Sequence, residues 1–121
     1  MGFRVLVVDD QEDFRLAAQS LLKEFGVDIH LAEDGAQAVE LCNQKGFNLI
    51  FMDVHMPGMD GFETASAIRK SNFGDEIVIY GLTSDDSIEV KKKCAEVGMA
   101  NFIKKPLRFE DFQRVILKHR G

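Results

Sequence analysis

Tryptophan is absent from this 121-residue sequence, and proline and cysteine occur only twice each. The longest apolar runs, such as residues 5–8 and 49–52, fall far short of the roughly 20 residues that a membrane-spanning helix needs. Scarce proline together with 45% apolar residues excludes a disordered or collagen-like chain. Cys42 and Cys94 lack metal-ligand spacing, so we predict two reduced cysteines in the core and no disulfide framework.

Acidic residues outnumber basic residues in this sequence. Fifteen Lys and Arg residues against 20 Asp and Glu residues give a net charge of −5 and a pI near 5.1. This balance argues against direct binding to nucleic-acid phosphates. The N-terminus has neither a long apolar segment nor a small-residue cleavage site, so we predict no export signal, no membrane contact and a cytoplasmic location. No linker or repeat interrupts the chain, and residues 1–121 are predicted to form one domain.

Short apolar runs alternate with longer amphipathic stretches along the whole chain. The strand-like runs cover residues 3–8, 27–31, 48–52, 77–81 and 100–103. Strict strand–helix alternation with short connections predicts a single α/β domain with a five-stranded parallel sheet. Residues 5–8 and 49–52 are apolar without alternation, which is typical of central strands covered by helices on both faces.

Capping residues mark the ends of the predicted helices. Three helix starts have an acidic residue followed three positions later by Gln or Glu: Asp34 with Gln37, Asp60 with Glu63, and Asp86 with Glu89. Gly26, Gly46 and Gly98 are predicted stops. In the last helix, Phe109, Phe112 and Ile116 share one face and are expected to pack on the sheet. His30 and His119 are expected at the surface.

Carboxylates follow two of the predicted strands. Asp9 and Asp10 come directly after the first strand, and Asp53 follows the third. In a doubly wound sheet, ligands bind beyond the carboxyl ends of the strands, where the strand order reverses. Two unit charges about 4 Å apart repel by about 4 kcal/mol at an effective dielectric of 20, so a bound cation or a raised pKa is expected. Mg²⁺ is the simplest cation for such a set of oxygen ligands.

The remaining strand ends supply groups that suit a phosphoryl group. Thr83 ends the fourth predicted strand with a hydroxyl, and Lys105 follows the fifth with an ammonium group. An aspartate can attack phosphorus to form an acyl phosphate while a metal ion and a lysine neutralise the transferring oxygens. Asp53 is then the candidate nucleophile.

Four motifs in this order resemble the response-regulator receiver domain, the phosphoacceptor module of two-component signalling. They are Val7-Val8-Asp9-Asp10, the segment from Met52 to Gly61 around Asp53, Leu82-Thr83-Ser84, and Phe102-Ile103-Lys104-Lys105-Pro106. The resemblance covers essentially the whole chain and implies a flavodoxin-like sheet of order 2-1-3-4-5. Features of residues 97–99 and 105–107 slightly favour a receiver of a hybrid histidine kinase over a stand-alone regulator.

The resemblance also implies roles for individual residues. Asp53 is expected to accept a phosphoryl group from a phosphohistidine of a histidine kinase or histidine phosphotransfer protein. Asp10, Asp53 and the backbone carbonyl of His55 are expected to hold Mg²⁺, with Asp9 reaching it through water. Lys105 and Thr83 are expected to contact phosphate oxygens, and the Lys105–Pro106 peptide bond is expected to be cis.

Phosphorylation is expected to alter the surface formed by the fourth helix, fifth strand and fifth helix. The resemblance assigns the switch to Thr83 and Phe102, and assigns to His55 and Asp85 the rate at which the domain removes its own phosphate. Phe102 lacks the hydroxyl of a tyrosine, so the switch is expected to be looser. Arg108 stands where a Ser or Thr cap is frequent, which predicts a weak start of the last helix.

Other functions fit the residues less well. A phosphohydrolase of the haloacid dehalogenase type needs a second Asp two positions after the first, where this chain has His55, and residues for a cap domain. A flavin-binding flavodoxin needs a hydroxyl-rich phosphate loop, whereas residues 9–13 are acidic. His55 as a transition-metal ligand lacks a partner at ligand spacing, and His119 as a phosphodonor lacks a helical bundle. Lys91, Lys92 and Lys93 are either a solvated helix face or a partner-recognition site.

Overall fold

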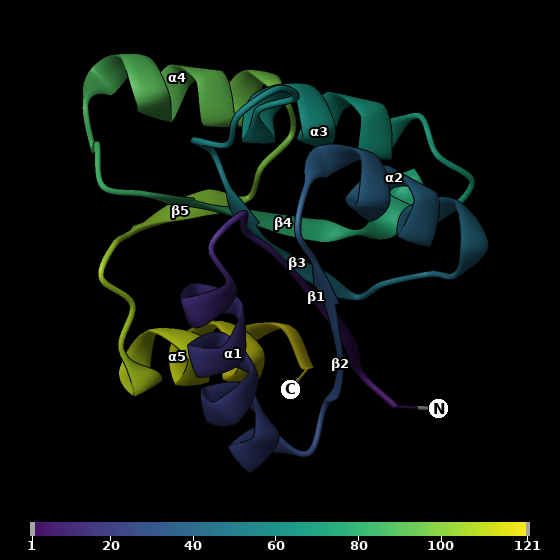
Figure 1. Cartoon of the computed structure of the whole chain (residues 1–121), viewed down its shortest axis with the longest axis vertical. Helices are drawn as coiled ribbons and strands as arrows, with labels where there is room; N and C mark the ends of the chain where they lie inside the picture. Colours follow the sequence, from purple (N-terminus) through teal and green to yellow (C-terminus); the bar gives the residue numbers. More distant parts are fainter. Residues whose placement is uncertain (1, 121) are drawn as a thin grey trace.

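A computed structural model describes residues 2–120, apart from the side chain of residue 75, and Figure 1 shows strands and helices alternating along the chain. The strands are β1 (Arg4–Val8), β2 (Asp28–Ala32), β3 (Leu49–Asp53), β4 (Val78–Thr83) and β5 (Asn101–Lys104). The α-helices are α1 (Glu12–Leu22), α2 (Gly35–Gln44), α3 (Gly61–Arg69), α4 (Ile88–Glu96) and α5 (Phe109–Arg120). Two short 3₁₀ helices, η1 (Lys23–Phe25) and η2 (Gly74–Glu76), follow α1 and α3.

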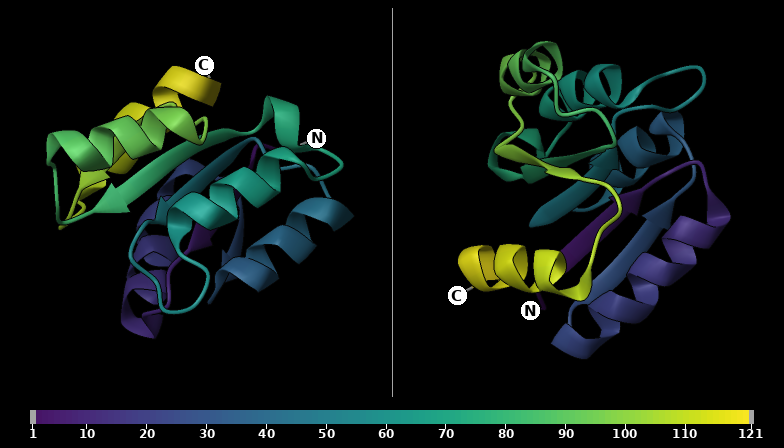
Figure 2. Two further views of the ribbon diagram at one scale, coloured as in Figure 1. Left: turned by 90° about the horizontal axis from the view of Figure 1, so that it is seen from above. Right: turned by 90° about the vertical axis from the view of Figure 1, so that its left-hand side faces the viewer.

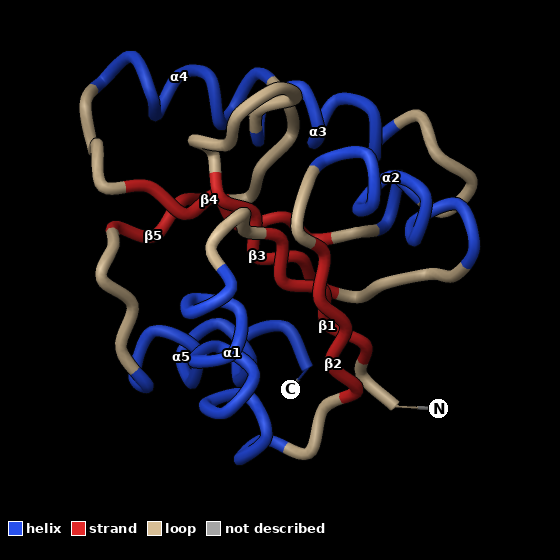
Figure 3. The backbone as a smooth tube through the Cα atoms, in the orientation of Figure 1, coloured by secondary structure: helices blue, strands red, loops and turns tan. Residues whose placement is uncertain are grey.

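The strands form one parallel sheet in the order β2-β1-β3-β4-β5, which confirms the predicted fold class. Helices α2, α3 and α4 cover one face, and α1 and α5 cover the other (Figures 1 and 2). Figure 3 shows the strands between these two helical layers. The chain leaves β1 toward α1 and leaves β3 toward α3, on opposite faces, and such a divergence opens a crevice at the carboxyl edge of the sheet.

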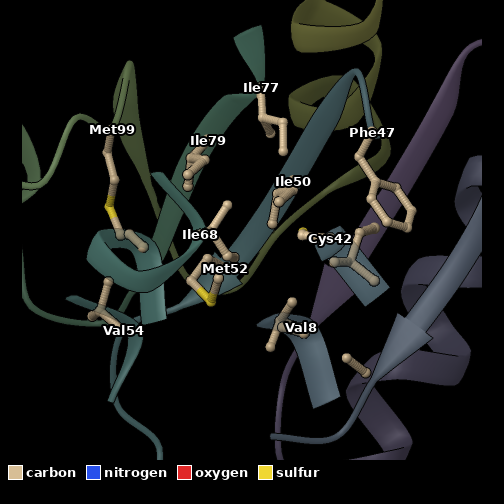
Figure 4. Close-up of a cluster of buried hydrophobic side chains, with 14 of the residues drawn as sticks. Val8, Cys42, Phe47, Ile50, Met52, Val54, Ile68, Ile77, Ile79 and Met99 are labelled. Atoms are coloured by element: carbon tan, nitrogen blue, oxygen red, sulfur yellow. The ribbon is translucent and has the colours of Figure 1, made fainter. Parts of the chain in front are cut away.

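Side chains of β1 and β3 point alternately into two apolar cores. Leu6, Val8, Ile50 and Met52 lie in the core under α2, α3 and α4, part of which Figure 4 shows. The intervening residues of the same strands join the core under α1 and α5: Val5, Val7, Leu49 and Phe51. Both strands are therefore buried on both faces, as their continuous apolar sequences predict.

Both cysteines are free thiols in the core. Cys42 is completely buried and Cys94 is 3% exposed. The prediction of two reduced core cysteines is confirmed. Burial raises the pKa of the Cys42 thiol to about 11 and also raises that of Cys94, which keeps both in the unreactive thiol form.

Two of the three predicted helix caps are confirmed. The Asp34 carboxylate accepts a hydrogen bond from the Gln37 amide at 2.7 Å. Asp60 and Glu63 form a complete capping box at the start of α3. The third prediction is wrong by one residue, because the Ser87 hydroxyl, and not Asp86, caps α4 through the Val90 amide. The Asp85 carboxylate accepts a bond from the Ser87 amide at 2.9 Å, and this turn places the helix start after Ser87.

Helix α5 packs on the sheet through the predicted face, and one histidine predicted at the surface is half-buried in its last turn. Phe112 and Ile116 are buried, and Phe109 is half-buried and stacks on Phe25 with ring centroids 5.1 Å apart. His119 is half-buried, and its Nε2 lies 2.8 Å from the Tyr80 hydroxyl. This contact exists because Tyr80 reaches the last turn of α5 from β4.

The other predicted surface histidine is also half-buried. His30 Nε2 lies 3.2 Å from an Asp28 oxygen, and the His30 ring packs edge-on against Phe47.

Within residues 2–120, no helix has the length and apolar character needed to cross a lipid bilayer.

Candidate functional site

The carboxyl ends of β1 and β3 bring three aspartates together. The two strands pair in register, with Val8 opposite Met52, so the residues that follow lie side by side. Asp9 is completely buried and Asp53 is 4% exposed, whereas Asp10 is exposed. One carboxylate oxygen from each of the three residues lies within 4.8 Å of the others. The convergence of carboxylates predicted from the sequence is therefore present.

Lys105 reaches this cluster from the end of β5. Its amide donates a 2.8 Å hydrogen bond to the Thr83 carbonyl, which continues the pairing of β4 with β5. The ammonium Nζ lies 2.9 Å from Asp9 Oδ2 and 3.6 Å from Asp53 Oδ1. It also lies 4.6 Å from the centre of the Phe14 ring. The next peptide bond, Lys105–Pro106, is cis as expected.

The loop after Asp53 depends on glycine. The Gly61 amide bonds to the Val54 carbonyl at 3.2 Å and brings the start of α3 against the end of β3. A Cβ at Gly61 would lie 2.3 Å from the Asp53 carbonyl oxygen, so no larger residue fits there without a shift of the backbone. Gly58, earlier in the loop, has a φ of 75°.

One ammonium group does not neutralise three carboxylates, and the electrostatics of Asp53 reflect this. Burial raises the pKa of Asp53 to about 6, and the charges of Asp9 and Asp10 add to the rise. The His55 amide, which donates to Asp53 Oδ1 at 3.1 Å, and the Lys105 charge act in the opposite direction. The cluster therefore favours an additional positive charge.

Thr83 ends β4 beside this cluster and is completely buried. Its hydroxyl accepts a hydrogen bond from the Asp85 amide at 2.9 Å and lies 3.1 Å from the Asp85 carbonyl. His55 Nε2 lies 3.2 Å from the oxygen of the Thr83 hydroxyl. The structure thus brings Thr83, His55 and Asp85 into one hydrogen-bonded group next to Asp53.

A cleft of about 430 Å³ opens over the carboxylates. Its lining includes Asp10, Asp53, His55 and Lys105. Phe102, the remaining predicted switch residue, does not line this cleft. It is half-buried, packs against the core under α4, and has Lys91 Nζ 5.7 Å from its ring centre.

Some site contacts were missed from the sequence. Gln11 donates its amide to Asp9 Oδ1 at 2.9 Å, an Asx-type turn that the Asp9-Asp10-Gln11 sequence could have suggested. Arg15 donates to the Asp9 carbonyl at 2.8 Å. No signal in the sequence marks Arg15, because its role depends on how α1 folds back across the end of β1.

The model of the response regulator receiver domain matches residues 5–117. This chain belongs to that family. The receiver is 36% identical, over 96% of its length, to hybrid signal transduction histidine kinase B of Dictyostelium discoideum. It is 32% identical to Protein PilG of Pseudomonas aeruginosa, covering 98% of this chain and 87% of PilG. The chain spans only 6% to 13% of the Dictyostelium kinase and two Pseudomonas sensor proteins.

Solved structures agree with this membership. Chemotaxis protein CheY4 of Vibrio cholerae superposes with a TM-score of 0.93 at 29% identity, covering 98% of the receiver and 99% of CheY4. A sensor histidine kinase receiver from Pseudomonas aeruginosa, with magnesium in its active-site cleft, gives 0.89 at 26% identity and covers 98% of both chains. The Saccharomyces cerevisiae Ssk1 receiver, solved in complex with the histidine phosphotransfer protein Ypd1, superposes with a TM-score of 0.88 at 26% identity. The match covers 98% of this chain and 88% of the solved chain.

Proposed function

We propose that the receiver is a phosphorylation switch in which Asp53 accepts a phosphoryl group from a partner phosphohistidine. A carboxylate oxygen of Asp53 attacks phosphorus, an O–P bond forms, and the N–P bond breaks. The electron pair leaves with the imidazole nitrogen, which then takes a proton. The observation that carries this proposal is the burial of Asp53 beside Asp9, Asp10 and Lys105 in one cleft.

Magnesium fits this cleft. Three carboxylates with oxygens within 4.8 Å of one another form a hard, anionic donor set, and Lys105 neutralises it only in part. Asp10, Asp53 and the His55 carbonyl would hold the ion, with Asp9 acting through water. When bound, Mg²⁺ supplies positive charge against the phosphoryl oxygens. The magnesium-containing receiver from Pseudomonas aeruginosa supports this proposal.

Lys105 and Thr83 would stabilise the acyl phosphate from the protein side. The Lys105 ammonium already lies 3.6 Å from Asp53 Oδ1, within reach of an oxygen on a phosphoryl group bound there. The Thr83 hydroxyl would donate to a second oxygen. Phe102 would then turn inward, changing the surface of α4, β5 and α5. Only contacts that differ between the two states can shift this equilibrium.

The phosphodonor is proposed to be a histidine kinase or a histidine phosphotransfer protein, and the Ssk1–Ypd1 complex of a similar receiver supports this class of partner. Loss of the phosphate would occur in the receiver itself. A water oxygen attacks phosphorus, the bond to Asp53 breaks, and inorganic phosphate leaves. His55 and Asp85 would set the rate of this step from positions near the cleft.

Acetyl phosphate with Mg²⁺ tests the proposal. Wild-type protein is expected to gain one base-labile phosphate, measured by intact mass. Asp53→Asn and wild type in EDTA are both expected to lose this modification, because the first lacks the nucleophile and the second the cation.

Asp86→Asn provides the matched control, since Asp86 is an exposed carboxylate that pairs with Lys104 at 3.7 Å at the surface. It should be phosphorylated like wild type. Equal modification of Asp53→Asn and wild type would disprove the nucleophile, and full modification in EDTA would disprove the need for the cation.

A further inference from the structure

The backbone amide and the imidazole of His55 contact two different residues of the site. The amide donates to Asp53, whereas the imidazole Nε2 lies 3.2 Å from the Thr83 hydroxyl. His55 is exposed in the loop after β3, and Thr83 is completely buried at the end of β4. The imidazole therefore covers a buried hydroxyl from the solvent side, between two strands that pair directly in the sheet.

The proton of the Thr83 hydroxyl is already engaged in this arrangement. A hydroxyl offers one proton and two lone pairs, and the Thr83 hydroxyl has three partners: the Asp85 amide, the Asp85 carbonyl and His55 Nε2. If Nε2 carries a hydrogen, it donates to Thr83 and the hydroxyl proton goes to the Asp85 carbonyl. If it does not, the hydroxyl proton is shared between two acceptors. In both cases, no proton is free for a phosphoryl oxygen.

We propose that the His55 imidazole is a positioning group that holds the Thr83 hydroxyl in the unphosphorylated arrangement. This role rests on the proposed phosphorylation of Asp53. For Thr83 to donate to a phosphoryl oxygen on Asp53, its proton must turn away from the Asp85 carbonyl, and its side chain must move toward Asp53 and away from His55 Nε2. His55 thereby adds to the stability of the resting state, and its contribution is lost when the switch operates.

The size of the effect follows from the net strength of one hydrogen bond. Loss of the His55–Thr83 contact is expected to increase the population of the switched arrangement, and the apparent affinity for a phosphoryl analogue, about two- to tenfold. Loss of this contact leaves the Lys105 ammonium beside the Asp53 carboxylate, because those two side chains meet directly.

Three substitutions at His55 distinguish the effect of the Nε2 hydrogen bond from the effect of the size of the side chain. His55→Phe keeps a planar ring and removes both nitrogens. His55→Gln places an amide nitrogen where Nε2 stands, and His55→Asn places one nearer the backbone, too short to reach Thr83. The apparent affinity for beryllofluoride, a phosphoryl analogue, is measured with Mg²⁺ by titration of backbone amide signals in the full chain.

The midpoint is expected to fall two- to tenfold in His55→Phe and His55→Asn, and to return to the wild-type value in His55→Gln. The effect should vanish in a Thr83→Ala background, because the proposal routes it through the hydroxyl. An unchanged or higher midpoint in both His55→Phe and His55→Asn overturns the proposal. The proposal is also overturned if His55→Gln does not restore the wild-type midpoint, or if His55→Phe still lowers the midpoint in the Thr83→Ala background.

The same samples distinguish failure of this inference from failure of the proposed function. Each variant is also treated with acetyl phosphate and weighed. Phosphorylated wild type with insensitive midpoints removes only the role of His55. Wild type that takes no phosphate removes the proposed function and the role of His55 with it.

Discussion

Asp53 shows how burial and neighbouring charges act together on one carboxyl group. Its ionised form loses hydration and faces Asp9 and Asp10, while one amide and one ammonium group compensate only in part. The resulting pKa of about 6 leaves the group ionised at neutral pH, as a nucleophile requires, but at a cost in folding stability. The proposed nucleophile is thus a source of instability in the metal-free protein.

Asp53→Asn is therefore expected to stabilise the metal-free protein at high pH. The folded-state pKa is raised above 3.8, so the favourable contribution of Asp53 is present below pH 3.8 and is lost as pH rises through about 6. In EDTA at pH 8 we expect the substitution to raise the free energy of unfolding by about 1 to 2 kcal/mol. The gain should shrink at pH 5. Urea denaturation at both pH values measures it.

Glu96→Gln removes one negative charge from an exposed position and serves as the control for net charge. Its effect is expected to stay within about 0.5 kcal/mol at both pH values. A loss of stability in Asp53→Asn at pH 8 would contradict the prediction.

The residues of the site were predictable to different degrees. Asp9, Asp53 and Lys105 directly follow or end strands, and the parallel sheet alone places such positions at one edge. Asp10 is exposed, and its closeness to the other two could be inferred only with the strand order. The contacts of Arg15 with Asp9 and of His55 with Thr83 depend on side-chain conformations, which no spacing in the sequence encodes.

At the scale of elements, the apolar pattern located every strand and the carboxyl end of β1, but it placed the carboxyl ends of the other four strands one or two residues too early. β3, β4 and β5 run on into Asp53, Thr83 and Lys104, beyond the apolar residues that predicted them. Backbone hydrogen bonds form irrespective of side-chain polarity, so pairing continues where the hydrophobic pattern stops. Two of these polar strand ends, Asp53 and Thr83, lie in the site, and its other residues directly follow β1 and β5.

Helix α5 begins directly after Arg108, where the sequence predicts a weak cap. Arg108 precedes the helix and has no side-chain oxygen, although the Asp111 carboxylate accepts its amide at 2.9 Å. Arg108→Ser would add the missing acceptor for an amide of the first turn. We expect it to raise the free energy of unfolding by about 1 kcal/mol over Arg108→Ala, as measured by urea denaturation.

Arg108→Ala is the matched reference because it also removes the exposed guanidinium, whose 3.9 Å pair with Asp111 contributes little. The prediction fails if the serine variant is no more stable than the alanine variant.

At the scale of the whole molecule, the sheet gathers the site from segments far apart in the chain. Lys105 and Asp9 are separated by 96 positions in the sequence, and yet they form the shorter of the two ion pairs of Lys105, at 2.9 Å. A cation at this edge would therefore link the loops after β1 and β3, whose carboxylates already pair with Lys105 from the loop after β5. Its binding requires the folded chain, because the unfolded chain does not hold the three carboxylates together.

Magnesium is accordingly expected to stabilise the folded receiver by mass action. At one hundred times its dissociation constant, the gain is about 2.7 kcal/mol, which corresponds to a rise in melting temperature of several degrees. Thermal unfolding over a MgCl₂ series, with KCl at matched ionic strength, measures the rise, and EDTA should abolish it. Asp10→Asn should reduce the rise strongly, because it removes one of the three carboxylates proposed to hold the ion. Asp10 is exposed, so the substitution leaves the core intact. An equal rise in Asp10→Asn, or in KCl alone, would show that the carboxylates at the end of β1 and β3 do not hold the ion.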